Sequence, residues 1–249
     1  MLIEITHVTK RYGSVTPVND VSFSVQQGEI VGFVGPNGAG KSTTMKMLAC
    51  LLPPSEGTAK IAGFDTVYQS TDARRNLGYL PESVPLYDDM TVRSYLDYMG
   101  ALRDVPKPDR RRLVDAVIET VGVAEYRDRA IRTLSKGYRQ RVGIGQTILH
   151  EPPVVILDEP TNGLDPAQMV EMRKVIRALG KEHAVLLSSH LLSEVALICD
   201  RMVVISRGRI VGDGSMAELS KAASLGPTAT AEDIFMSLTG TSEAQATHG

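Results

Sequence analysis

The hydrophobic residues at the start of the chain alternate with polar ones. Ile3 and Ile5 fall on one side of an extended segment, and Val21, Phe23 and Val25 do the same with serines between them. A period of two is typical of strands that bury one face, and such strands usually belong to antiparallel sheets. We therefore expect an antiparallel sheet near the N-terminus.

Later apolar stretches are continuous rather than alternating. They lie at residues 30–34 (IVGFV), 154–159 (VVILDE), 184–190 (AVLLSSH) and 202–206 (MVVIS). Continuous apolar runs of this length are typical of strands buried on both faces, as in a parallel sheet covered by helices. A helix-like run at 42–52 follows the first of them and is predicted to end at Pro53 and Pro54. The core is therefore predicted to be α/β with a mainly parallel sheet.

From about residue 83 to 150 the apolar residues follow helical spacing. One stripe begins after Thr91, a predicted N-cap, and comprises Val92, Tyr95, Leu96, Met99 and Leu102. A second stripe comprises Leu113, Val114, Val117, Ile118 and Val121. Spacings of three and four positions predict amphipathic helices, so we expect a mainly helical subdomain inserted into the α/β core here.

The residues after Leu219 are rich in Ala, Ser, Thr and Gly. They contain one short amphipathic piece, EDIFMSL at 232–238, which offers little apolar surface for packing. We therefore predict a domain at 1–220 and a loosely attached tail at 221–249.

Composition narrows the class of protein. The chain has 249 residues, 43% of them hydrophobic, which allows one domain with a substantial core. Its net charge of −2 gives no basic field for nucleic acid, so no nucleic-acid partner is expected. No apolar run reaches the roughly 18 residues that span a bilayer, and Glu4 interrupts the apolar N-terminus, so neither a membrane span nor a signal peptide is predicted. We expect a cytoplasmic protein, with Cys50 and Cys199 as core residues outside any disulfide or metal site.

The segment 35–42 (GPNGAGKS) matches GxxxxGK[ST], a phosphate-binding loop. It follows a predicted strand and opens a predicted helix, where backbone amides and the helix N-terminus bind phosphate. Lys41 is expected to contact the β and γ phosphates, Ser42 to ligate Mg²⁺ and Thr43 to reach an inner phosphate. An ordinary glycine turn is the alternative, although the pattern arises by chance in only about one chain in a hundred. The predicted nucleotide-binding residues here are Gly35, Pro36, Asn37, Gly38, Ala39, Gly40, Lys41, Ser42 and Thr43.

Asp158 and Glu159 end the predicted strand at 154–159, at the edge where parallel sheets bind ligands. Asp158 is expected to contact Mg²⁺ through water, and Glu159 to act as the general base for an attacking water. Solvation of a strand end or capping of a helix is the alternative. His190 ends another strand and is a candidate contact for the γ phosphate, although a single histidine is more often structural.

The segment 134–141 (LSKGYRQR) precedes a helix-like run and resembles a second anion site. The Ser135 hydroxyl, the Gly137 amide and the helix N-terminus would all favour an anion. A capped helix start explains Ser135 but leaves Gly137 unexplained. The sequence thus poses the question of why one small protein needs two such sites.

Together, the motifs of residues 1 to about 220 resemble those of the ATP-binding cassette (ABC) ATPases, the motor subunits of ABC transporters. They are, in the family's order, RYG, GPNGAGKST, YLPE, LSKGYRQR, VVILDEPTNGLDP and SSH. The resemblance implies a P-loop NTPase core with an N-terminal antiparallel β-subdomain and an inserted helical subdomain. It also implies ATP and Mg²⁺ as cofactors and a separate membrane permease as partner, which would hold the chain on the cytoplasmic face of the membrane.

The resemblance also answers the question of the second anion site. In the family, two cassettes pair head to tail, and the signature segment of one closes over the γ phosphate bound by the other. The segment Leu134, Ser135, Lys136, Gly137 and Tyr138 would therefore bind the nucleotide of a second copy or of a paralogous cassette. The usual signature is LSGGQ, so Lys136 and Tyr138 replace a glycine and the glutamine, whose side-chain contacts are lost.

Further roles follow from the resemblance. Tyr12 is similar to the aromatic residue that stacks on adenine, although a core position is equally consistent with the sequence. Glu82 stands where the family usually has a glutamine that links Mg²⁺ and the attacking water to the permease. Asp165 is similar to a residue that communicates between the two sites. By resemblance, the metal ligands are Ser42, Glu82 and Asp158, and the catalytic residues are Glu159 and the switch histidine, His190.

The departures at Glu82 and in the signature are similar to those of drug, polysaccharide and gliding-motility exporters, which favours export. Glu82 and residues 83–96 are predicted to dock on the permease, with Tyr87, Tyr95 and Tyr98 as either interface or core residues. One alternative is a cassette ATPase that acts on DNA or ribosomes, although the chain has no coiled-coil insert or second cassette. Another alternative is a GTPase or a small-molecule kinase. A GTPase would need an NKxD motif, which is not present, and a kinase would not explain LSKGYRQR.

Overall fold

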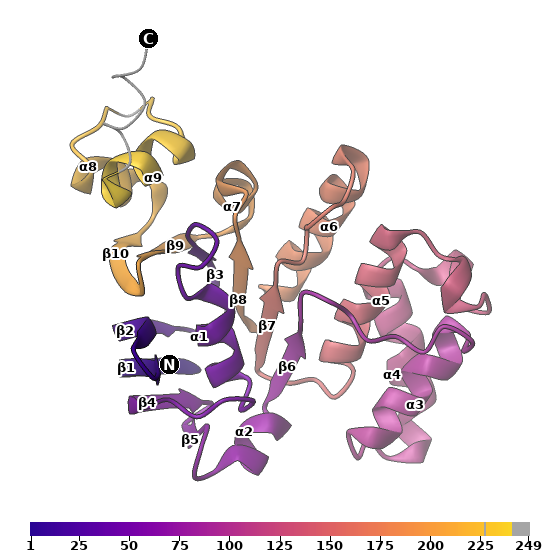
Figure 1. Cartoon of the computed structure of the whole chain (residues 1–249). Coiled ribbons are helices and arrows are strands. Elements are labelled where there is room, and N and C mark those ends of the chain that lie inside the picture. Colours follow the sequence, from indigo (N-terminus) through magenta and orange to yellow (C-terminus); the bar gives the residue numbers. More distant parts are fainter. Residues whose placement is uncertain (227, 241–249) are drawn as a thin grey trace.

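In a computed structural model, two β-sheets pack one above the other (Figure 1). The structure describes residues 1–226 and 228–240. The first sheet has the order β2-β1-β4-β5 and is antiparallel. Its strands are β1 (Ile3–Tyr12), β2 (Val15–Val25), β4 (Glu56–Ile61) and β5 (Phe64–Asp65). The predicted antiparallel sheet near the N-terminus is therefore confirmed.

The second sheet has the order β10-β9-β3-β8-β7-β6. Its strands are β3 (Ile30–Val34), β6 (Leu77–Leu80), β7 (Val154–Asp158), β8 (Ala184–Ser189), β9 (Arg201–Ser206) and β10 (Arg209–Gly214). The pairs from β9 to β6 are parallel, and only β10 runs antiparallel, at one edge. The prediction of an α/β core with a mainly parallel sheet is confirmed, while the sequence patterns missed β6 and β10.

Two hydrophobic cores lie on opposite faces of the parallel sheet, which explains why its strands are continuously apolar. Along β7, Val155 and Leu157 belong to the core formed with helices α3 to α7. Val154 and Ile156 belong to the core formed with the antiparallel sheet. All four side chains are fully buried. Phe23 and Phe33 stack with their ring centroids 5.3 Å apart and so tie the two sheets together.

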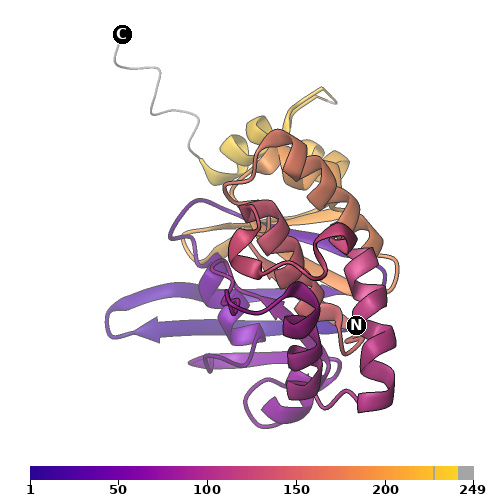
Figure 2. The ribbon, with the colours of Figure 1, turned by 90° about the vertical axis from the view of Figure 1, so that its right-hand side faces the viewer.

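The helices surround the parallel sheet (Figures 1 and 2). They are α1 (Lys41–Leu48), α2 (Ser70–Arg75), α3 (Val92–Leu102), α4 (Lys107–Thr120), α5 (Lys136–Ile148), α6 (Pro166–Leu179), α7 (Leu192–Ile198), α8 (Met216–Ala222) and α9 (Ala231–Thr239), with 3-10 turns at Ala124–Tyr126 and Ile131–Thr133. As predicted, the segment between 92 and 148 is mainly helical, and the Thr91 side chain accepts a hydrogen bond from the Ser94 amide as the cap of α3. Within the described part of the chain, no helix has both the length and the hydropathy to span a bilayer.

Helix α1 is shorter than the sequence predicts. It ends at Leu48 rather than before Pro53, because Cys50 adopts a left-handed conformation (φ 58°) that cannot continue a right-handed helix. The amide of Leu51 then donates back to the Lys46 carbonyl at 2.9 Å and closes the turn. Cys50 and Cys199 are both free and half-buried, which fits their predicted packing role.

The prediction of a loosely attached end from residue 221 is wrong for the part of the tail that the structure describes. The predicted boundary falls inside α8, and α9 buries Ala231 and Ile234 against the core. Helix α9 packs against α7, α8 and β10. The apolar faces of these three elements pack against the short amphipathic segment, which has too little apolar surface to be stable by itself. Residues 241–249 lie outside the described residues.

Candidate nucleotide site

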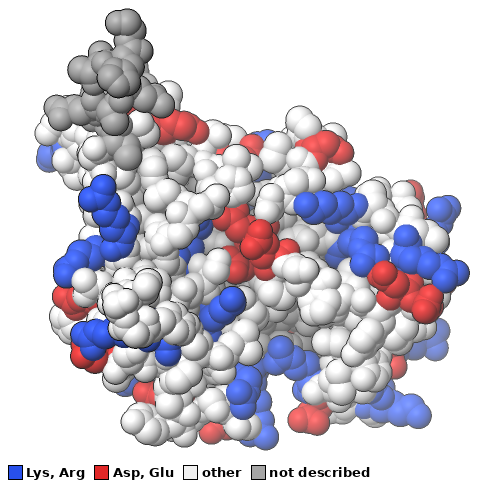
Figure 3. Space-filling model, in the orientation of Figure 1, with Lys and Arg blue, Asp and Glu red and all other residues white. Residues whose placement is uncertain are grey.

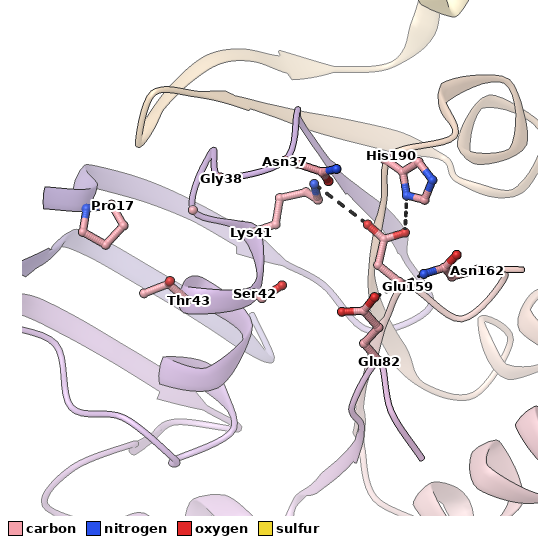
Figure 4. A pocket seen from close by; sticks show the side chains of 11 residues that line it. Pro17, Asn37, Gly38, Lys41, Ser42, Thr43, Glu82, Glu159, Asn162 and His190 are labelled. Carbon is pink, nitrogen blue, oxygen red and sulfur yellow. Dashed lines mark hydrogen bonds and ion pairs between the residues drawn. The ribbon is translucent and has the colours of Figure 1, made fainter. Parts of the chain in front are cut away.

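A cavity of about 500 Å³ opens at the carboxyl ends of β3, β7 and β8. Parallel sheets bind ligands at this edge because the strand-to-helix loops converge there. Figure 4 shows its side chains converging from separate segments of the chain. The cavity is lined by Pro17, Asn37, Gly38, Gly40, Lys41, Ser42, Thr43, Glu82, Glu159, Asn162 and His190.

The phosphate-binding loop wraps the start of α1. Gly38 and Gly40 have φ angles of 79° and 110°, which side chains with a Cβ rarely adopt. A Cβ on Gly40 would also lie 2.4 Å from the Pro17 carbonyl oxygen, so only glycine fits where the loop crosses β2. Gly40 is the N-cap of α1 and provides no side-chain acceptor, and the first turn holds no acidic residue. The positive end of this helix is therefore available to an anion.

Lys41 is folded back over its own loop. Its Nζ donates to the Gly35 carbonyl at 2.7 Å and to the Pro36 carbonyl at 3.3 Å, and lies 3.9 Å from Glu159 Oε1. Burial lowers the pKa of this ammonium group, whereas the nearby carboxylates, Glu159 first among them, oppose the shift. The ammonium thus sits at the floor of the cavity, between the loop and the end of β7.

Glu159 directly follows β7 and is only 7% exposed. Its φ of 50° is unusual for a non-glycine residue, and such conformations persist only where surrounding contacts enforce them. Its amide donates to Ser188 Oγ on β8 at 2.9 Å, and its Oε2 lies 2.8 Å from His190 Nδ1. Residues at the end of β8 therefore hold Glu159 at its backbone and at its carboxylate, and the contact of the carboxylate with His190 is drawn in Figure 4.

Asp158 lies behind Glu159 and faces β8 rather than the cavity. Its Oδ1 accepts a hydrogen bond from the Ser188 hydroxyl at 2.6 Å, and its side chain is 3% exposed. Burial raises the pKa of this carboxyl group, while the hydrogen bond from Ser188 opposes the shift. Ser188 thus bridges Asp158 and the Glu159 backbone, a link that the sequence analysis missed although Ser188 lies in the SSH motif.

Glu82 and Asn162 form a second polar pair on the far wall of the cavity. Asn162 Nδ2 donates to Glu82 Oε1 at 3.1 Å. The sequence analysis did not select Asn162, although it stands three residues after Glu159 in the loop that leaves β7. Position in the same strand-to-helix loop as a candidate base is the signal that would have found it.

Negative charge exceeds positive charge around the cavity. Acidic side chains gather at the centre of the face shown in Figure 3, and Glu82, Asp158 and Glu159 all act on Lys41 electrostatically. Adding a triphosphate to three carboxylates and one ammonium would need a further cation. Among the described residues, no group of three or more His, Cys, Asp or Glu is placed to hold a metal alone. Ser42 and Glu82 line the cavity with oxygen donors that fit Mg²⁺, whose other ligands are commonly phosphate oxygens and waters, whereas Asp158 lies behind the cavity lining and could reach the ion only through water.

The segment 134–138 lies outside the lining of the cavity. Ser135 is the N-cap of α5, yet its side chain makes no capping hydrogen bond, so helix capping does not account for this serine. Gly137 packs against α6 so closely that a Cβ would lie 2.7 Å from Gln168 Oε1. The rings of Tyr138 and Tyr126 contact each other at a tilt of 41°, with their centroids 4.1 Å apart. Packing within the chain thus engages Tyr138, whereas Gly137 meets only the end of the flexible Gln168 side chain and the Ser135 hydroxyl is left for another partner.

Three further predicted residues have clear positions. Asp165 caps α6, because its Oδ1 accepts from the Gln168 amide at 2.8 Å. Tyr12 is 51% exposed at the end of β1 with Lys10 Nζ 5.1 Å from its ring centroid, so the alternative of a core tyrosine is wrong. Tyr95 is 1% exposed, and its hydroxyl donates to Gln146 Oε1, so it is a core residue and not an interface residue.

Residues 18–162 match the family described as ABC transporter. The chain is 35% identical to the ABC transporter ATP-binding protein NatA of Bacillus subtilis (strain 168), over 88% of this chain and 91% of that protein. It is 36% identical to the bacitracin transport ATP-binding protein BcrA of Bacillus licheniformis, over 88% and 72% of the two chains. A solved structure of an ATP-binding subunit of an ABC transporter superposes with a TM-score of 0.85 at 28% identity, covering 96% of this chain and 99% of that one.

Proposed function

The chain belongs to the ABC transporter family as an ATP-binding subunit and an ATPase, and from this premise we propose how it works. Two copies, or this chain and a paralogous cassette, pair head to tail on two ATP molecules with Mg²⁺. Pairing and release drive a separate membrane permease, which holds the cassette on the cytoplasmic face of the membrane. Relatives named for bacitracin transport and linearmycin resistance support export as the direction.

Hydrolysis rests on the residues at the ends of β7 and β8. We infer that Glu159 accepts the proton of the attacking water, because its carboxylate is buried and lines the cavity and its backbone amide is bound by Ser188 on β8. His190 orients that carboxylate through the 2.8 Å contact. Lys41 lies where it can turn from its loop carbonyls to the phosphates of the nucleotide. Ser42 and Glu82 would hold Mg²⁺, with Asp158 acting on it through water, and the ion neutralises phosphate charge when it is bound.

One observation carries the pairing: among the described residues, the Ser135 hydroxyl and the start of α5 contribute nothing to the lining of the nucleotide cavity of their own chain. The cavity lining contains no residue of 134–138, and the Ser135 side chain makes no hydrogen bond to the start of its own helix. A helix N-terminus with a free hydroxyl favours a phosphate. ATP bound to the phosphate loop of a second copy would supply that phosphate.

We expect ATP to bring Ser135 of one copy to the phosphate loop of the other. One variant would carry Asn37→Cys and a second Ser135→Cys, each with Cys50→Ser, Cys199→Ala and Glu159→Gln. In an equimolar mixture, a short bifunctional thiol reagent should join the two chains in the presence of ATP and Mg²⁺. The product is measured by mass spectrometry of the linked peptides.

The matched control replaces Ser135→Cys with Thr120→Cys, which lies at the end of α4 and outside the signature segment. Head-to-tail pairing predicts no ATP-dependent product with that partner. Equal yields for both partners, or equal yields with and without ATP, would exclude the proposed arrangement.

Residues 82–96 are the proposed docking surface for the permease. Tyr87 is 52% exposed and Tyr98 40% exposed. Their ring centroids lie 5.7 Å apart, and Tyr87 also contacts the buried Tyr95 edge-on. The two exposed rings therefore pack on a buried residue of the helical segment. Exposed tyrosines of this kind are enriched in protein interfaces.

Replacing Tyr87 by Ala is expected to reduce the amount of multi-span membrane protein retained by the immobilised chain from detergent-solubilised membranes by at least about fivefold, since anchor aromatics carry much of an interface's affinity. Tyr68→Ala is the matched control, because Tyr68 is 91% exposed but lies between β5 and α2. Retention that is unchanged in Tyr87→Ala, or lowered equally in both variants, would remove Tyr87 from the surface.

A further inference from the structure

Helix α7 begins directly after His190, and a side chain from the far end of the chain holds its first turn. Leu191 is the N-cap residue of α7 and has no side-chain acceptor. Instead, the Ser193 amide donates to Glu232 Oε1 on α9 at 3.1 Å. The first amides of a helix need such acceptors, and a carboxylate at this end also matches the helix dipole.

The other side of His190 is fixed as well. The amide of Leu191 donates to Ser189 Oγ at 3.0 Å, which anchors the turn to the end of β8. The His190 backbone therefore lies between one contact to β8 and another to α9. From this position the ring reaches Glu159 (Figure 4).

Glu232 is an exposed residue at the start of the last described helix. It lies in the first turn of α9, where Thr230 and Asp233 form a reciprocal capping box. Ala231 and Ile234, on either side of it, are buried, and α9 packs against α7. In Figure 1, α9 and α8 lie together at one end of the molecule, beside β10. The carboxylate is thus presented to α7 from a rigid helix start.

A second contact acts on the same turn from the other direction. Glu194 of α7 pairs with Arg173 of α6, with Nε and Oε2 3.1 Å apart. Arg173 fixes the side of α7, whereas Glu232 accepts the amide next to the turn that carries His190. Loss of Glu232 would therefore loosen the start of α7 while leaving the helix docked.

We propose that Glu232 is a positioning residue for ATP hydrolysis, which holds the start of α7 so that His190 meets Glu159. This inference rests on the proposed roles of His190 and Glu159. It assigns a function to the C-terminal helix pair: α9 acts on the reaction through α7, without touching the nucleotide cavity.

The test compares Glu232→Ala with Glu232→Gln. Removal of the acceptor is expected to lower kcat about three- to tenfold with KM for ATP unchanged, since the phosphate loop is not disturbed. The glutamine variant retains an amide oxygen for the Ser193 amide and should stay within about twofold of the parent. Amide hydrogen exchange in residues 191–195 should be faster in Glu232→Ala alone. Glu218→Ala is the matched control, because that carboxylate accepts only at the start of its own helix, α8, and its loss should leave kcat unchanged.

A double-mutant cycle with His190→Ala separates this inference from the proposed function. If His190→Ala lowers kcat and Glu232→Ala adds no further loss in that background, Glu232 acts through His190. If His190→Ala lowers kcat while Glu232→Ala alone has no effect, or the losses simply add, the positioning role is wrong and the proposed function stands. If His190→Ala is fully active, the proposed role of His190 fails, and the inference fails with it.

Discussion

Replacing Glu159 by Gln is expected to lower kcat for ATP hydrolysis by about 10²- to 10³-fold, because an amide cannot accept the proton of the attacking water. ATP affinity should stay within about threefold, since the substitution keeps the size of the side chain and an acceptor for His190 at the 2.8 Å contact. Phosphate release and nucleotide binding, measured separately, give the two quantities. With hydrolysis blocked and Mg²⁺–ATP present, the variant should accumulate as a dimer in light scattering.

The matched control is Glu82→Gln, which changes another cavity carboxylate by the same atoms. Glutamine keeps one side-chain oxygen, whose two lone pairs can accept from Asn162, as Glu82 does at 3.1 Å, and also face the metal, so turnover should fall by less than about tenfold. Comparable losses in the two variants would mean that charge in the cavity matters and that Glu159 has no special role. Glu159→Gln protein that stayed monomeric with ATP, both in solution and with its permease, would contradict ATP-driven pairing.

Replacing Lys41 by Met is expected to weaken ATP binding by about 100-fold or more, because charge-assisted hydrogen bonds to phosphate are lost from a buried site. The Lys41 side chain is only 6% exposed and already points its ammonium into the cavity floor. Methionine fills a similar volume, so the fold should survive with a similar melting temperature. Equilibrium titration with a fluorescent ATP analogue measures the affinity, and circular dichroism checks the fold.

Lys46 provides the control for Lys41 because it lies on the same helix, exposed and in the last turn. Lys46→Met should leave ATP affinity within about twofold. A Lys41→Met affinity within tenfold of the parent would show that the backbone amides of the loop and the helix N-terminus supply most of the phosphate binding.

Much of the site was readable from short stretches of sequence. The loop at 35–43 is contiguous, and two of its glycines meet a local backbone requirement that the structure displays, the φ of 79° at Gly38 and of 110° at Gly40. Asp158 and Glu159 were also found locally, because an apolar strand that ends in two carboxylates brings them to the binding edge of a parallel sheet.

Other parts depended on contacts between distant segments. Asn162 meets Glu82 across 80 positions, Ser188 meets Asp158 across 30, and Pro17 reaches the phosphate loop from β2. No periodicity in the sequence signals such pairs. Tyr12 and Tyr95 were equivalent as aromatic residues, and only their neighbours in space made one exposed and the other core.

The C-terminal helices show most clearly which features depend on nearby residues and which depend on distant ones. Their capping boxes, Ser215 with Glu218 and Thr230 with Asp233, are local and present in the sequence, whereas the burial of Ile234 comes from other elements. Backbone conformation and strand-end chemistry were thus determined locally, by residues a few positions apart. Only the tertiary structure decided which face of each element is buried, which loops lie together and whether α9 contacts α7. The reason is that burial and hydrogen bonding between remote segments depend on where the whole chain places them.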